Sequence, residues 1–466
     1  MNKKLMALAV AGAVAAPGLA VAQTSLTPTS IVPSPGVASS NGITLYGRLD
    51  EIIVVNKYSS ANSSVAPNLP VSELKKGDVW AAGNALGFRG REDLGGGTAA
   101  WFQLEIGAWP DGRLEASATT GNNWGGRNSA IGLSSGVGDI LIGIWDTPYK
   151  QTFGVWNSLT SGGFSSAGIT IGNGDTTGAL PAFNGTTGAQ CNNIVSNATG
   201  TPVTTSNGIC VTEAPSNGTG FSRRVNNSVQ YWSPIIGGFQ AKLMTALANY
   251  QQPGSNQLPS GLPKAKEYSL SVAFVQGPFS VGAGYDAHEG LRPGTGVGAN
   301  PNPKDTAWQI GGKFNMGMGE VGVAYESISY GSNNGSLATP AGAMDLPSWA
   351  VNGRLNLGPG ALWASYSKTD AKSCSATNTV IGSAACGVQA KMYALGYDYV
   401  LSKRTKMYVA YNKIDNGVIT NANGSFAAGS SYYYIAGPAA NQNGSSGGLA
   451  PGTDVTSYGI GVQHTF

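Results

Sequence analysis

Charged residues two positions apart are the feature of this chain with the clearest chemical consequence. Arg48 and Asp50 are separated by one residue, and so are Arg89 and Arg91. Residues i and i+2 of a β-strand share one face, so each pair would project two charged groups to the same side. The residues of opposite phase are apolar: Leu45, Leu49 and Ile53 near the first pair, Leu86 and Phe88 near the second. This pattern predicts fixed charges along a polar wall, which act on ions without breaking bonds.

Catalytic and metal chemistry are not indicated. The chain has 2 histidines, His288 and His464, which leaves little for a Ser/His/Asp site or a zinc site. His288 is expected where a loop starts and His464 on the apolar face of a strand. The carboxylates Glu92 and Asp93 fall in a tight turn. We therefore expect a protein that is not an enzyme and has no cofactor and no metal.

The amino terminus has the pattern of a secretion signal. Lys3 and Lys4 precede a short apolar stretch, and an A-x-A cleavage site ends at Ala22. We expect a signal peptide at residues 1–22, followed by a flexible lead rich in Thr, Ser and Pro at 23–42. Lys and Arg number 27 and Asp and Glu 24, and two of the lysines leave with the signal. This near balance argues against a nucleic-acid partner.

Sixteen segments alternate large apolar residues with small or polar ones, which is the strand pattern. In Tyr268-Ser-Leu-Ser-Val-Ala-Phe274 every second residue is large and apolar. Beyond the signal, no apolar run is long enough for a membrane helix, and charged residues make up only 11%. The strands are expected at residues 43–56, 79–92, 97–107, 127–134, 138–145, 225–233, 238–250, 266–276, 278–288, 305–315, 319–330, 347–357, 360–369, 388–400, 403–415 and 455–466.

The connections between these segments alternate strictly between tight turns bearing mostly Gly or Pro and long polar loops. An even-stranded up-and-down barrel requires this alternation, whereas a β-sandwich needs crossovers and does not sort its loops by length. We therefore predict an all-β fold, a 16-stranded antiparallel up-and-down transmembrane β-barrel with long extracellular loops, embedded in outer-membrane lipid. A barrel of this width is not filled by its wall side chains, so its lumen holds water.

The last strand and the aromatic residues support the same fold. Residues 455–466 end on Phe466 and are expected to pair with 43–56, which leaves no open edge. Part of the aromatic set near strand ends is expected to form interfacial belts. This set comprises Tyr46, Trp232, Trp308, Trp349, Trp363, Tyr408, Tyr411 and Tyr458.

The longest connection, residues 146–222, is far longer than an ordinary loop, and such loops are usually functional or disordered. It contains Cys191 and Cys210, and a second polar loop contains Cys374 and Cys386. An even number of cysteines in an exported chain favours disulfides, and local pairing within each loop is the simplest of three connectivities.

Six motifs, in order along residues 43–466, closely resemble the general porins of Gram-negative bacteria, in particular the β-proteobacterial type. They are Ile43-Thr-Leu-Tyr-Gly-Arg-Leu-Asp50, Leu86-Gly-Phe-Arg-Gly-Arg-Glu-Asp-Leu-Gly-Gly-Gly97, Phe102-Gln-Leu-Glu105, Asn227-Ser-Val-Gln-Tyr-Trp-Ser-Pro234, Leu401-Ser-Lys-Arg-Thr405 and Gly461-Val-Gln-His-Thr-Phe466. The resemblance implies a homotrimer, an inward-folded third loop at 146–222 and recognition of Phe466 by the barrel assembly machinery.

The resemblance also implies acids on the third loop opposite arginines on the wall. The wall candidates carried over are Arg48, with Asp50 beside it, Arg89 and Arg91, whose phase independently points to the lumen. Arg127 shares the phase of Ile131 and Leu133, so it would need a bulge to turn inward. Further cations of lumenal phase are Lys242, Lys313 and Arg354. The candidate loop acids are Asp146, Asp175 and Glu213, although for Asp175 and Glu213 a solvated loop charge is the preferred interpretation.

The expected function is passive diffusion of small hydrophilic solutes, with selectivity set by pore width and fixed charges. Many relatives carry arginine where this chain has Ile144, Gln230 and Gln463, so the resemblance does not imply strong anion preference. Two alternatives remain open. A channel selective for sugars or aromatic acids would need a lumenal track of stacking rings, for which the candidates are Trp101, Trp145, Trp232 and Trp363. A structural or adhesive barrel would use its long loops, 146–222 and 416–454, to bind partners.

Overall fold

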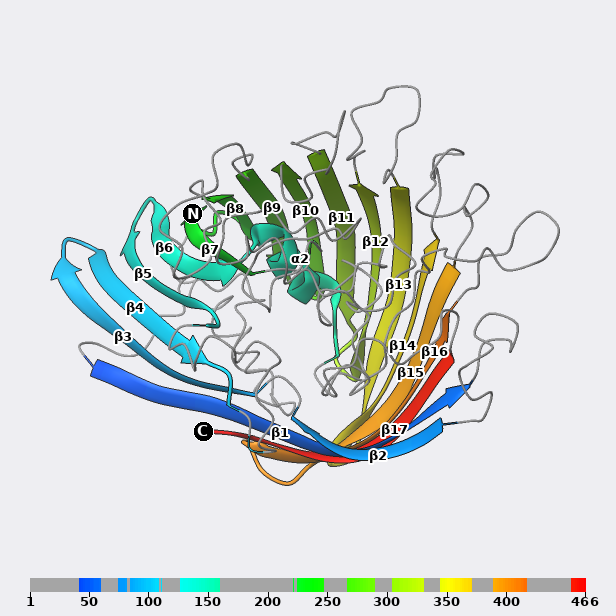
Figure 1. Ribbon diagram of the computed structural model, residues 1–466. Coiled ribbons are helices and arrows are strands. Elements are labelled where there is room, and N and C mark those ends of the chain that lie inside the picture. Colours follow the sequence, from blue (N-terminus) through cyan, green and yellow to red (C-terminus); the bar gives the residue numbers. More distant parts are fainter. Residues whose placement is uncertain are drawn as a thin grey trace, which may run out of the picture.

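The computed structural model describes the strands and the turns that join them, and one helix (Figure 1). The described residues are 42–59, 74–81, 84–108, 110, 126–159, 221, 224–246, 266–289, 304–330, 344–370, 389–416 and 454–466. The predicted signal peptide, the lead up to residue 41, Asp175, Glu213 and the four cysteines lie outside these residues.

The elements follow one another in the chain as strands, with a single described helix after β6. They are β1 (Gly42–Ser59), β2 (Leu74–Ala81), β3 (Ala85–Gly95), β4 (Thr98–Ile106), β5 (Ser129–Ser135), β6 (Gly138–Asp146), α2 (Pro148–Trp156), β7 (Arg224–Trp232), β8 (Phe239–Ala246), β9 (Lys266–Gln276), β10 (Phe279–Glu289), β11 (Lys304–Asn315), β12 (Gly319–Tyr330), β13 (Met344–Leu357), β14 (Gly360–Asp370), β15 (Gln389–Val400), β16 (Thr405–Asn416) and β17 (Asp454–Thr465). None of the helices in the described part of the chain could cross a membrane.

The strands form one closed antiparallel sheet, which confirms the predicted barrel. Apart from β2 and β3, each strand pairs with its neighbours in sequence, and β1 pairs with β17 from Arg48 opposite Thr465 to Ser59 opposite Asp454. The main chains of Gly47 and Phe466 exchange two hydrogen bonds of 3.1 Å at the end of this seam. Figure 1 shows the first and last strands side by side at the base of the barrel wall. The pairing of β1 with β17 joins the two ends of the sheet.

The second wall position differs from the prediction of one strand at 79–92. It consists of two segments, β2 and β3, which both pair with β1, so seventeen segments make sixteen wall positions. The break lies beside Asn84, whose side-chain oxygen accepts a 2.6 Å hydrogen bond from the Asp50 main-chain N–H. The Asn84 amide also donates to the Glu51 carboxylate at 2.8 Å. The side chain therefore replaces a ladder hydrogen bond that the break removes.

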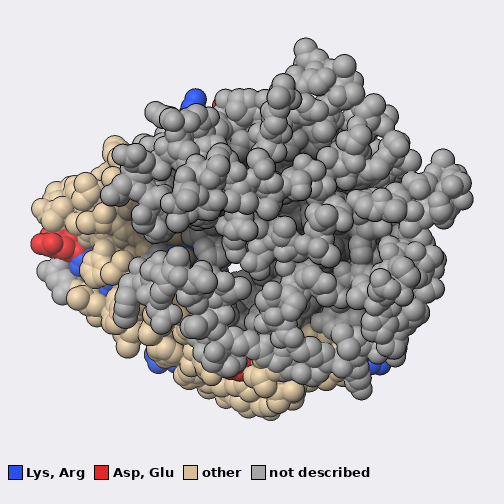
Figure 2. Space-filling model, in the orientation of Figure 1, with Lys and Arg blue, Asp and Glu red and all other residues tan. Residues whose placement is uncertain are grey.

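Alternation sorts the side chains between two environments. On β11, Trp308 and Ile310 are exposed on the outside, whereas Ala307 and Gln309 are buried on the inside. In Figure 2 the described outer surface over β3–β6 is mostly uncharged, as a lipid-facing band should be. The aromatic set divides between the two faces. Trp308, Trp349, Tyr411 and Tyr458 are exposed, whereas Tyr46, Trp232, Trp363 and Tyr408 are buried and lie on the inner face. The interfacial belt expected for part of this set is therefore restricted to the four outward-facing residues.

Candidate pore constriction

Helix α2 begins directly after β6 because the local sequence favours a helix start. Thr147 is the N-cap, and its hydroxyl accepts a 3.0 Å hydrogen bond from the Lys150 main-chain N–H. Pro148 occupies the first turn, where its missing N–H costs nothing. The helix ends at Asn157, which is extended and donates its main-chain N–H to the Phe153 carbonyl. The third loop therefore starts with a short helix, which is called the rod below.

This rod lies inside the barrel against the inner faces of β9, β10 and β11. The Tyr149 N–H donates to the Ser269 hydroxyl at 3.0 Å, and the Tyr149 hydroxyl donates to Glu326. Gln309 links both ends of the rod, because its amide donates to the Tyr149 carbonyl at 2.9 Å and its oxygen accepts from the Trp156 indole at 3.2 Å. The first part of the predicted third loop, up to Leu159, thus lies inside the barrel against its wall.

Glycines on the inner wall let the rod approach closely. A Cβ built on Gly311 would come within 2.6 Å of the Trp156 ring, and one on Gly284 within 2.7 Å of the Thr152 hydroxyl. A Cβ on Gly322 would overlap the Trp156 carbonyl oxygen. Side chains at these positions would displace α2, so the three glycines form a shallow seat for it on β10, β11 and β12.

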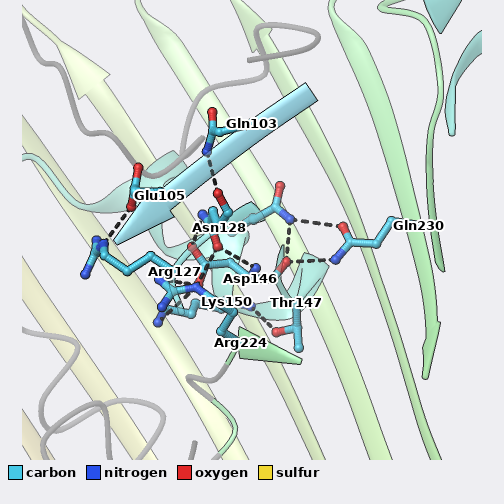
Figure 3. Close-up of polar contacts among 10 residues, drawn as sticks. Gln103, Glu105, Arg127, Asn128, Asp146, Thr147, Lys150, Arg224 and Gln230 are labelled. Carbon is cyan, nitrogen blue, oxygen red and sulfur yellow. Dashed lines mark hydrogen bonds and ion pairs between the residues drawn. The ribbon is translucent and has the colours of Figure 1, made fainter. Parts of the chain in front are cut away.

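A polar network anchors the rod where it leaves the wall (Figure 3). Asp146 ends β6 and lies 3.3 Å from the Lys150 ammonium and 3.4 Å from the Arg224 guanidinium. Its carboxylate also accepts a 2.8 Å hydrogen bond from Asn128. The main-chain carbonyl of Asp146 accepts from Gln151 and Gln230. Asp146 is therefore an anchor of the loop, not an acid presented to an arginine wall.

A second cluster lies on the inner face of β1, β3 and β4. The Arg127 guanidinium contacts the Glu105 carboxylate at 2.6 Å, and the Tyr46 hydroxyl donates to the same carboxylate at 3.1 Å. The Arg89 guanidinium lies 5.0 Å from the centre of the Tyr46 ring, within the range of a cation–π contact. Arg127 precedes β5 and is not part of it. Its position ahead of the strand frees it from strand phase, so the inward direction needs no bulge.

A third cluster joins β1 to β13–β17. The Tyr408 hydroxyl and the Gln463 amide donate to Asp50 at 2.6 and 2.7 Å. On the neighbouring strands, Asp398 is buried and lies 2.9 Å from the Lys406 ammonium and 3.5 Å from the Arg354 guanidinium. Each carboxylate thus accepts several hydrogen bonds or ion pairs, which offsets its loss of hydration.

Exposure differs between the two signs of charge in these clusters. The Arg127 and Lys150 side chains are 21% and 17% exposed, whereas those of Glu105 and Asp146 are 0% and 2% exposed. Arg354 is 12% exposed, and Asp398 is completely covered. Arg48, Arg89 and Arg91 are likewise partly exposed. In these three pairs the carboxylate is covered and the cation keeps some exposure, whereas the Arg224 and Lys406 side chains, at 9% and 4%, are buried as well.

Three of the four candidate tryptophans form a cluster packed into the wall. Trp145 lies between Trp101 and Trp232, with ring centroids 6.0 and 5.8 Å apart and edge-to-face geometry. All three are buried. The Lys242 ammonium lies 4.4 Å from the centre of the Trp232 ring and donates to Gln151 of α2 at 2.6 Å. The cluster therefore supports the wall beneath the start of α2 and offers no open ring face for stacking.

The structure brings most of the predicted site residues to the inner wall, but not as one ring. The residues that face inward are Arg48, Asp50, Arg89, Arg91, Arg127, Lys242 and Arg354. Asp146 lies at the base of α2. Sequence reasoning missed Glu105, Asp398 and Lys406 as partners of these residues. Strand alternation places Glu105 on the same face as Gln103, and Asp398 on the same face as Gly396. Their inward direction could therefore have been predicted from the sequence. It also missed α2, for which Thr147-Pro148 was the available signal.

Comparisons with known proteins agree with this architecture. A family model described as Gram-negative porin matches residues 7–418. Outer membrane porin protein 32 of Delftia acidovorans is 24% identical over 474 residues, covering 100% of both chains. Major outer membrane protein P.IB of Neisseria gonorrhoeae is 35% identical over 130 residues, which is 28% of this chain and 34% of that protein. The chain thus matches about a third of the length of that relative.

Solved structures resemble the fold at low sequence identity. An anion-selective porin from Comamonas acidovorans superposes with a TM-score of 0.56 at 19% identity, covering 91% of this chain and 99% of that one. OmpT of Vibrio cholerae gives a TM-score of 0.53 at 14% identity, covering 91% and 97%. These likenesses concern the arrangement of the strands.

Proposed function

The chain belongs to the family of Gram-negative porins and is an outer-membrane β-barrel, and on that basis we propose that it is a water-filled channel for passive diffusion of small hydrophilic solutes, with a preference for anions. Porins are channels and not enzymes, and no catalytic step is part of the proposal. We infer that the passage is narrowest between α2 and the part of the wall that carries the second and third clusters.

The anion preference follows from the exposure of the lumenal charges. Glu105, Asp146 and Asp398 are buried beneath their partners, whereas Arg127, Lys150 and Arg354 remain partly exposed. A permeating ion interacts most strongly with charges that reach the water, because buried carboxylates are already neutralised by close cations. The partly exposed cations therefore add more to the field in the passage than the covered acids do, although each ion pair weakens the charge of both partners. The relative from Comamonas acidovorans is described as anion-selective, which supports the proposal.

The candidate for selective transport of sugars or aromatic acids is less well supported. Ring-shaped solutes would need exposed aromatic faces, and Trp101, Trp145, Trp232 and Trp363 are all buried. No feature of the described residues favours the structural or adhesive alternative. We therefore retain general diffusion as the function.

The trimer and the recognition of Phe466 by the assembly machinery are also part of the proposal. Family membership supports both, and the outward-facing Phe466 is consistent with the second: its side chain is 41% exposed and lies over Gly47.

The decisive experiment is a planar-bilayer recording of the refolded barrel in a KCl gradient. We expect stable step increases in conductance and a zero-current potential whose sign corresponds to chloride preference. Absence of conductance would refute the channel. A potential with the sign of potassium preference would leave the channel intact and refute the preference for anions.

A further inference from the structure

Four ionisable side chains gather on the inner face of β9, β10 and β11, at the strand ends that lead to the long loops. They are Glu267, Asp286, His288 and Asp305, and each is 0% exposed. His288 is directly opposite Glu267 on β9 and opposite Asp305 on β11. Asp286 precedes His288 by two residues, so all four share one face. Three adjacent strands thus surround one imidazole with three carboxylates.

The histidine ring is oriented like that of a metal ligand. His288 Nε2 lies 3.2 Å from Asp305 Oδ2, a hydrogen-bond distance. His288 Nδ1 has no hydrogen-bond partner although it is buried, and lies 3.8 Å from Asp286 Oδ1. One potential ligand atom each from Glu267, Asp286 and His288 lies within 4.8 Å of the other two. Metal-bound histidines commonly donate their second ring N–H to a carboxylate, which fixes the ring and its tautomer.

We propose that Glu267, Asp286 and His288 bind a divalent transition-metal cation of the zinc class, with Asp305 as the residue that orients His288. One imidazole nitrogen and two carboxylates suit Zn²⁺, whereas Ca²⁺ and Mg²⁺ prefer all-oxygen ligands. Ligand atoms about 2.0–2.2 Å from a tetrahedral zinc lie about 3.3–3.6 Å apart, so atoms separated by as much as 4.8 Å would need to move up to about 1.5 Å closer. A dication would also offset the desolvation of carboxylates at a fully buried position.

The site lies where the third loop returns to the wall. The Phe221 ring stacks on the His288 ring, with centroids 4.4 Å apart and planes at 12°. Phe221 also contacts Tyr149 of α2, at 6.0 Å between centroids. A cation held by His288 would therefore fix the wall that supports both ends of the loop. The expectation of no metal rested on the small number of histidines, and His288, expected where a loop starts, belongs to β10.

A network of ion pairs within the chain is the competing account, because each of the three carboxylates makes a further polar or electrostatic contact. The two accounts differ in whether the cluster retains an added metal. The test uses the untagged, full-length barrel refolded in detergent, with Zn²⁺ as the probe in isothermal titration and in elemental analysis after gel filtration.

We expect wild-type protein to retain about one Zn²⁺ per chain. The variants His288→Gln and Asp286→Asn should retain none, and Asp305→Asn should bind Zn²⁺ about 10–100-fold more weakly. The matched control is His464→Gln, because His464 is the only other histidine and lies on the exposed face of β17. It should retain Zn²⁺ like the wild type.

Folding of each variant is checked by the shift in electrophoretic mobility between heated and unheated samples. Zn²⁺ should raise the unfolding temperature of the wild type and of His464→Gln but not that of His288→Gln. Retention of Zn²⁺ by folded His288→Gln, or no retention by the wild type, would overturn the site and favour the ion-pair network.

Discussion

Individual side chains determine charge in the lumen through their depth in the wall as much as through their sign. Glu105 is fully covered and neutralises Arg127, which is partly exposed. Replacing the buried Glu105 carboxylate should therefore strengthen the field of the Arg127 guanidinium, since an ion pair at 2.6 Å weakens the field of both partners.

The first prediction concerns this pair. Glu105→Gln should increase anion preference, and Arg127→Gln should decrease it, because glutamine keeps a hydrogen-bond acceptor or donor but no charge. The measurement is the zero-current potential of each variant in the same KCl gradient. Lys413→Gln serves as the control: Lys413 is 40% exposed, pairs with Asp415 near the loop end of β16, and should leave the potential unchanged. Equal potentials for all three variants would place Glu105 and Arg127 away from the narrow passage.

The second prediction concerns Trp145, which is buried between two other indoles. Trp145→Ala should reduce the free energy of unfolding by about 3–5 kcal/mol, because the ring leaves a cavity that neighbouring strands cannot close. Urea unfolding in lipid or detergent, followed by tryptophan fluorescence, measures this loss. Trp308→Ala is the control, because Trp308 is 46% exposed on the outer face and should cost less. An equal loss in both variants would contradict the structural role of the cluster.

At the scale of elements, the width of the passage depends on how closely α2 fits the wall. The fit rests on glycines of β10, β11 and β12 and on hydrogen bonds through Gln309, which contacts both ends of the helix. The helix and its seat are separated by about 130 residues or more in sequence, so neither alone indicates the passage.

The third prediction tests this seat. Gly322→Ala should push α2 away from the wall and change single-channel conductance, since its Cβ would overlap the Trp156 carbonyl oxygen. Because the rod would move toward the opposite wall, we expect lower conductance or frequent closures in bilayer recordings. Gly353→Ala is the matched control on β13, where a new Cβ would meet only the Glu320 carbonyl oxygen, at 3.4 Å. A Gly322→Ala trace identical to wild type would show that α2 tolerates the methyl group.

At the scale of the whole molecule, closure of the barrel depends on the pairing of the first and last strands. The seam ends in the two hydrogen bonds between Gly47 and Phe466, and the Phe466 ring covers Gly47 on the outer face. The terminal residue therefore contributes to the wall itself as well as to any recognition during assembly.

The fourth prediction separates these roles. Deletion of Phe466 should reduce the amount of barrel in the outer membrane of producing cells more than it reduces refolding in detergent. Trimer yield from membranes and heat-modifiable mobility after refolding measure the two effects. His464→Ala is the control, since it changes a neighbouring exposed side chain on the same face. Normal trimer yield after the deletion would argue against recognition of the terminal aromatic residue.

The sequence by itself determined the strand pattern, the even number of wall positions and the inward phase of Arg48, Arg89, Arg91 and Arg354, because a period of two fixes each side chain relative to its neighbours. The tertiary structure alone decided which side chains meet across the strands. Whether Asp146 faces a passing ion or anchors α2, whether Trp145 lines a track or packs in the wall, and whether His288 meets three carboxylates all depend on the register between strands and on the path of the third loop. Phase gives the face on which a residue lies, but cross-strand register and the path of the third loop set its depth and its partners.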